Sequence, residues 1–139
     1  MVGGVKAIFI VLLAFSLCVS AVEADKKPLT KEESAKVIEA AIRKAAKKPT
    51  GELTQADFEK VTKLNLESKK LTDVSGLEKL TQLTYLNLQH NELTDVKGLE
   101  KLTRLISLNL YFNPDLTKAQ IAELQKTLPK CLIHSNNKK

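Results

Sequence analysis

Residues 83–93 read Leu-Thr-Tyr-Leu-Asn-Leu-Gln-His-Asn-Glu-Leu, and this spacing of leucines around one asparagine constrains the fold more than any other feature of the chain. The leucine pattern returns 22 residues earlier, from Val61 to Leu71, and 22 residues later, from Leu105 to Asn113. A fixed period of this length is typical of chains in which successive units stack side by side. The sequence therefore predicts a solenoid.

Each unit contains a Leu-x-Leu core, which we expect to form a short strand. Alternate residues of a strand face opposite sides, so both leucines of a unit point into the solenoid. Stacking the units gives a parallel sheet with two buried columns: Leu64, Leu86 and Leu108 in one, and Leu66, Leu88 and Leu110 in the other. The return half of each unit, such as residues 71–77, is too short for a full helix and favours a tight or 3₁₀ turn.

An asparagine follows the strand in two of the units. Asn91 and Asn113 occupy a position where a buried side chain bonds the turning backbone. The first unit has Lys69 there instead. Lysine accepts no hydrogen bond, so the sequence predicts a looser and more exposed first turn.

The two units ending LTDVSGLEKLTQ and LTDVKGLEKLTR resemble the 22-residue leucine-rich repeats of the internalin-like bacterial class. Residues 37–57 resemble the helical cap that precedes such repeats. The resemblance implies an α/β fold: a short, curved solenoid with a parallel sheet of about four strands on its concave side, turns or 3₁₀ segments on its convex side, and helical caps. It also implies protein recognition, without naming a ligand.

The first 24 residues have the features of a secretory signal. Lys6 precedes an apolar run over residues 7–19, and Val22-Glu23-Ala24 offers small residues at a cleavage site. We expect cleavage after Ala24, with Ala21 as the alternative; a retained anchor and a lipid on Cys18 are competing interpretations. The expected location is exported: periplasmic, secreted or on the cell surface.

Two helix starts are predicted between residues 25 and 60, the expected N-terminal cap. Thr30-Lys31-Glu32-Glu33 has capping-box spacing, and Ile38 and Ile42 lie on one apolar stripe of the following helix. Thr54 and Asp57 favour a second, short helix. The other faces of the first helix carry a basic cluster: Arg43, Lys44, Lys47 and Lys48.

After the repeats of residues 61–113, the expected C-terminal cap covers residues 114–139. Thr117 and Gln120 predict another capped helix. Residues 131–136 read as a degenerate fourth unit, with Cys131 stacked under Leu108 and Ile133 under Leu110. This placement makes the thiol a small buried apolar group and not a reactive one.

No catalytic, cofactor-binding or metal-binding arrangement is predicted, since His90 and His134 are the only histidines and neither has ligand spacing. No enzyme activity, nucleic-acid partner or stable membrane insertion after cleavage is expected. The repeat register instead predicts an outward sheet surface for an unidentified protein partner. Its candidate residues are Lys63, Asn65, Glu67, Tyr85, Asn87, Gln89, Ser107, Asn109, Tyr111, Leu132 and His134.

Tyr85 and Tyr111 are the strongest of these candidates, because tyrosine combines a rigid apolar ring with a polar tip. Two other functions stay open. The chain has a net charge of +6, so its basic helix could bind an envelope polyanion or glycan. A structural fragment without a partner is the third possibility.

Overall fold

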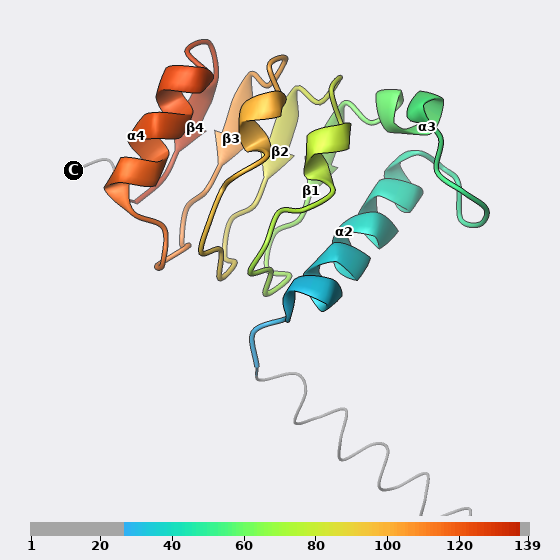
Figure 1. Cartoon of the computed structure of the whole chain (residues 1–139), viewed down its shortest axis with the longest axis horizontal. Coiled ribbons are helices and arrows are strands. Elements are labelled where there is room, and N and C mark those ends of the chain that lie inside the picture. The colour runs from blue at the N-terminus through green and yellow to red at the C-terminus, as the bar shows by residue number, and fades with distance from the viewer. Residues whose placement is uncertain (1–26, 137–139) are drawn as a thin grey trace, which may run out of the picture.

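Four short strands form one parallel sheet in chain order, and helices cover its two ends (Figure 1). The computed structural model describes residues 27–136, so the predicted export signal lies outside the described residues. The elements are α2 Lys31–Ala45, α3 Gln55–Glu59, β1 Lys63–Asn65, η1 Leu77–Lys79, β2 Tyr85–Asn87, η2 Leu99–Lys101, β3 Ser107–Asn109, α4 Lys118–Thr127 and β4 Leu132–His134.

The register of the first three strands is the one that the 22-residue period predicts. Leu64 pairs with Leu86, and Leu86 pairs with Leu108. The leucines two positions further on are also buried: Leu66, Leu88 and Leu110. Both predicted columns are therefore confirmed. The core of the molecule is a layer of leucines between the sheet and the convex side, and burying each one stabilises the fold by roughly 1.5–3 kcal/mol.

The convex side consists of 3₁₀ turns, as the short return segments predict. η1 and η2 each begin after a glycine, Gly76 with φ of 99° and Gly98 with φ of 98°. Residues other than glycine rarely adopt these φ values. The backbone N–H of each glycine donates to a nearby carboxylate, that of Glu78 or Glu100. The Gly-Leu-Glu-Lys sequence of both units thus closes its own turn.

The prediction based on Lys69 is right about exposure, since Lys69 is exposed where Asn91 and Asn113 are buried, but wrong about hydrogen bonding, because the first turn does not lack an acceptor. Asn91 Oδ1, from the next unit, accepts from the backbone N–H of Lys69 at 3.1 Å and of Leu71 at 3.0 Å. Asn91 Nδ2 donates to the carbonyls of Leu66 and Leu88, both at 2.9 Å. Each asparagine therefore bonds the preceding turn as well as its own, and Lys69 has no earlier turn in the sheet to serve.

α2 and α3 close the N-terminal end of the sheet. The Thr30 side chain accepts from Glu33 N, and Glu33 accepts from Thr30 N, which is the predicted capping box. Ile38 and Ile42 are buried against the first repeat. The helix is thus held by its apolar stripe, and α2 packs beside β1 (Figure 1).

Asp57, in α3, forms ion pairs with two lysines. Its carboxylate accepts from Lys48 Nζ at 2.7 Å, from both donors of Thr54, and from Lys60 Nζ at 3.2 Å. The Lys48 ammonium and the Thr54 donors hold the pKa of this carboxyl well below its usual range. Asp57 therefore ties Lys48, in the loop between α2 and α3, to helix α3.

The fourth strand exists, but the predicted register is wrong by two residues. Ile133 pairs with Leu108, a position expected for Cys131. Cys131 N donates to Leu128 O, as Leu105 N donates to Leu102 O, so Cys131 takes the place of the first leucine of a unit. Only one residue separates Cys131 from Ile133, where two separate Leu105 from Leu108. One position is thus deleted, and Ser135 falls in the Leu110 column.

Cys131 is 4% exposed, which confirms its placement in the core. Burial raises the pKa of the thiol to about 11 from an ordinary value of 9.0. At pH 8 we expect the thiolate fraction to fall by about 100-fold. A chain beginning at Asp25 contains this thiol alone, so its labelling by a thiol reagent should be at least about 100-fold slower in buffer than in 6 M guanidinium. Equal rates would place Cys131 at the surface.

Candidate binding surface

The structure places the predicted site residues in three rows across the concave face of the sheet. The row nearest the strand starts contains Lys63, Tyr85, Ser107 and Leu132, and the second contains Asn65, Asn87, Asn109 and His134. Leu132 and His134 therefore each lie one row from their predicted position, because of the β4 register. The third row contains Glu67, Gln89 and Tyr111.

The asparagine row is mostly occupied within the sheet. Asn87 Oδ1 accepts from Gln89 N at 3.0 Å and Asn87 Nδ2 donates to Glu67 at 3.2 Å. Asn109 repeats this pattern with Tyr111 N and Gln89 Oε1. Asn87 is only 7% exposed. These amides form a ladder that supports the sheet, so Asn87 and Asn109 are less available to a partner than the residues around them.

A cluster of rings lies at the carboxyl ends of the strands. The His90 and Phe112 rings stack with centroids 4.3 Å apart and planes 5° apart. Tyr111 lies 6.2 Å from Phe112 and 6.1 Å from His134. We call His90, Tyr111, Phe112 and His134 the ring cluster. His90 and Phe112 were not among the predicted site residues, although their 22-residue spacing was a signal that could have singled them out.

Two aliphatic side chains lie exposed where the strands begin. Leu132 is 59% exposed, and Ile106 is 64% exposed. In the earlier units threonine takes the place of Ile106, and Thr84 Oγ1 donates to Thr62 O at 2.9 Å. Ile106 cannot continue that hydrogen bonding. Exposed apolar side chains are thus concentrated at the starts of β3 and β4. The repeat fold does not require an apolar residue at the position of Ile106, because threonine takes this place in the earlier units.

Formal charge is confined to one end of this surface. Lys63 is the first residue of β1 and Glu67 follows that strand, whereas the outward residues of β2, β3 and β4 include no Asp, Glu, Lys or Arg. Across the whole chain 27% of residues are charged. The uncharged part comprises Tyr85, Gln89, His90, Ile106, Ser107, Asn109, Tyr111, Phe112, Leu132 and His134.

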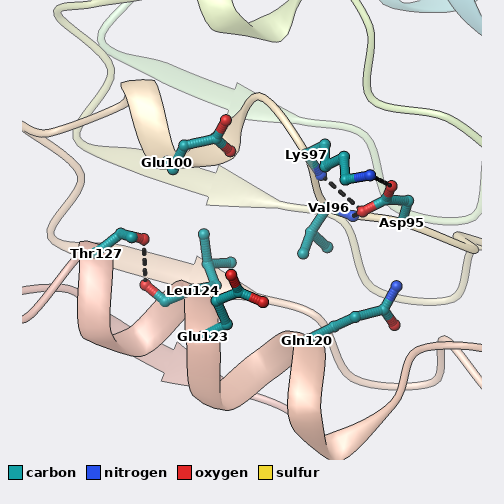
Figure 2. Close-up of a pocket in the computed structure, with 8 residues that line it drawn as sticks. All are labelled: Asp95, Val96, Lys97, Glu100, Gln120, Glu123, Leu124 and Thr127. Atoms are coloured by element: carbon teal, nitrogen blue, oxygen red, sulfur yellow. Dashed lines mark hydrogen bonds and ion pairs between the residues drawn. The ribbon is translucent and has the colours of Figure 1, made fainter.

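A separate groove of about 550 Å³ lies on the convex side, between α4 and the turn that contains η2. Figure 2 shows Glu100 on the turn and Glu123 on α4, with Val96 and Leu124 between them. Val96 and Leu124 are already buried. Asp95 accepts from Lys97 N and pairs with the Lys97 ammonium. The groove therefore offers little free apolar surface.

The described residues contain no group of three or more His, Cys, Asp or Glu side chains placed to hold a metal ion. Within residues 27–136, no helix has the length and hydrophobicity required to cross a bilayer.

The repeats match a known sequence family. Residues 81–126 match the family described as leucine rich repeats (2 copies). The fold is a short leucine-rich-repeat solenoid. No curated protein matches the chain.

Similar solved structures include an internalin from Listeria monocytogenes with a TM-score of 0.57, 23% identity, and coverage of 74% of this chain and 31% of that chain. An internalin C2 from the same organism has a TM-score of 0.47 and 20% identity, covering 73% of this chain and 57% of that one. The CBM51-2 and INT domains of Clostridium perfringens ZmpB have a TM-score of 0.48 and 34% identity, covering 55% and 16%. This solenoid thus spans about a third of the first of these structures.

Proposed function

We propose that this solenoid recognises a partner protein through the uncharged part of its concave face and carries out no catalysis. The observation that supports the proposal is the composition of that surface. Aromatic residues are enriched, and charged residues depleted, at the centre of protein interfaces. Here both features occur on β2, β3 and β4, in a chain that is more than a quarter charged.

The size of the surface indicates weak or multivalent binding. Four strands about 4.8 Å apart give a sheet only ~15 Å across. A stable interface buries roughly 800 Å² on each partner, so one solenoid is near the lower limit. We therefore expect rapid exchange unless several copies of the chain or of the partner are linked.

The tyrosines give the direct test. Tyr85 is 39% exposed and Tyr111 is 37% exposed. Replacing both with alanine should weaken capture of the partner from the native exported fraction by at least tenfold, because each interface tyrosine of this kind contributes about 1–2 kcal/mol. The melting temperature should change by less than about 3 °C, since neither ring lies in the core.

A matched variant, Lys44→Ala with Lys47→Ala, separates the polyanion alternative. Arg43 pairs with Glu39 and donates to Gly51 O, and Lys48 pairs with Asp57, so two of the four basic side chains already have partners. Recognition by the concave face predicts normal capture by the lysine variant and little dependence on salt. Capture that survives the tyrosine changes but fails at high salt would support the polyanion function instead.

We also propose that the protein is exported, on the basis of the charge and hydrophobicity pattern of residues 1–24. The purified exported protein should begin at Asp25, which intact mass and N-terminal sequencing would establish. Placing Arg within the apolar run, for example Leu12→Arg, should leave the precursor uncleaved in the cell. An intact N-terminus on the exported protein would argue for a retained anchor.

A further inference from the structure

Three residues at equivalent positions of successive units have left-handed backbone conformations: Ser68 with φ of 56°, His90 with 54° and Phe112 with 57°. This conformation is unfavourable for a side chain with a β-carbon, and asparagine or glycine usually occupies it. Ser68 shows that the turn forms without a ring. His90 and Phe112 therefore place rings in a strained position where the fold requires none.

The two rings form a parallel stack that runs from one unit to the next. His90 covers one face of Phe112, and Tyr111 lies beside it with its plane tilted by 45°. Phe112 is nevertheless 52% exposed. Among residues 27–136 only His90 stacks in parallel on this ring. The stack thus ends with aromatic surface that the described chain leaves uncovered.

The ring and hydrogen-bond partners that the described residues give Phe112 include no Asp, Glu, Lys or Arg. Tyr111 lies beside the ring, His134 lies beyond Tyr111, and Asn136 Oδ1 accepts from Phe112 N at 2.6 Å. This bond fixes the backbone under the ring, so the ring is held in place before any partner arrives. A second ring packs on such a surface in an offset stack or an edge-to-face contact, and such pairs contribute binding free energy beyond that of the area that they bury.

We propose that the partner presents an aromatic side chain that packs on Phe112 beside Tyr111 and extends the stack begun by His90. This inference rests on the proposed function and specifies the chemistry of the partner: an uncharged segment with an exposed tryptophan, tyrosine or phenylalanine. The ring cluster is the centre of the binding surface, and Tyr85 lies at its margin.

The test is an NMR titration of the chain from Asp25 with two uncharged probes, N-acetyltryptophanamide and N-acetylleucinamide. The chain contains no tryptophan, so every indole signal comes from the probe. We expect saturable amide shifts centred on Tyr111, Phe112 and His134, with at least fivefold tighter binding of the tryptophan probe, unchanged from 50 to 500 mM NaCl. Equal binding of the leucine probe, or shifts centred elsewhere, would overturn the proposal.

Two variants at Phe112 and one control outside the proposed surface complete the test. Phe112→Leu should abolish the preference for the tryptophan probe, whereas the variant Lys44→Ala with Lys47→Ala should keep it. Phe112→Gly, which suits the positive φ, provides a second version that folds without strain. A preference that survives both Phe112 changes would contradict the assignment. If the tyrosine pair abolishes partner capture but N-acetyltryptophanamide does not bind, recognition by the concave face stands and only the ring proposal fails.

Discussion

Replacing Asn91 with leucine should destabilise the protein by about 3 kcal/mol or more, the largest effect we expect from one polar substitution. The buried amide of Asn91 bonds four backbone groups at 2.9–3.1 Å: the N–H groups of Lys69 and Leu71 and the carbonyls of Leu66 and Leu88. Leucine leaves three of these groups without the side-chain partner, while Leu88 O still accepts from Asn113 Nδ2 at 3.0 Å. Each unpaired buried group costs about 1–3 kcal/mol. Urea unfolding followed by circular dichroism measures the loss.

Asn65→Leu is the matched control for that substitution. Asn65 is exposed and its side chain accepts one hydrogen bond, from Glu67 N at 3.0 Å. We expect the control to cost less than about 1 kcal/mol. Similar losses in both variants would mean that the buried amide is not what holds the turns together.

The second large effect concerns the apolar columns. Leu88→Ala should cost about 3 kcal/mol, because the side chain is fully buried between Leu66 and Leu110 and its removal leaves a cavity. Leu132→Ala makes the same chemical change at a position that is 59% exposed and should cost less than about 0.5 kcal/mol. The free energy of unfolding of both variants, from urea melts with an unchanged m-value, checks this contrast.

If Leu88→Ala and Leu132→Ala lost equal stability, the leucine layer would not be the continuous core described above. A partial loss with a reduced m-value in Leu88→Ala would show instead that the units on either side unfold separately, which the nearest-neighbour contacts of a solenoid permit.

Much of the fold could be predicted from the sequence because the period is regular. The 22-residue spacing sets the pairing of Leu64, Leu86 and Leu108 directly. Capping residues such as Thr30 and Thr117 predict the start of the helix that follows each of them, and both capping boxes form. In each of these cases a single rule, the repeat period or the capping box, connects the sequence pattern to the structure.

The fourth strand shows where this reasoning stops. α4 replaces the 3₁₀ turn before β4, and the longer path removes the fixed count on which the register depended. The residues after Cys131 fit two alignments equally well by pattern. Burial of Ile133 under Leu108 selects between them, and that choice depends on packing which no local spacing encodes.

The binding surface was predicted in part. The periodicity identifies which residues face outward, but not that the asparagine row is used by the sheet itself, since the bonds of Asn87 and Asn109 join different units. The ring cluster depends on left-handed turns at His90 and Phe112, and a sequence of leucine positions does not specify the backbone angles between them.

Asn91 accepts hydrogen bonds from the turn of the preceding unit, and this has a consequence for how the chain folds during synthesis. The turn at Lys69 and Leu71 obtains its acceptor only after about 20 more residues have left the ribosome, and the turn at Leu93 waits in the same way for Asn113. No unit is complete by itself at the moment it emerges. Acquisition of structure should therefore lag behind elongation by one whole repeat, and each newly made segment finishes the one before it.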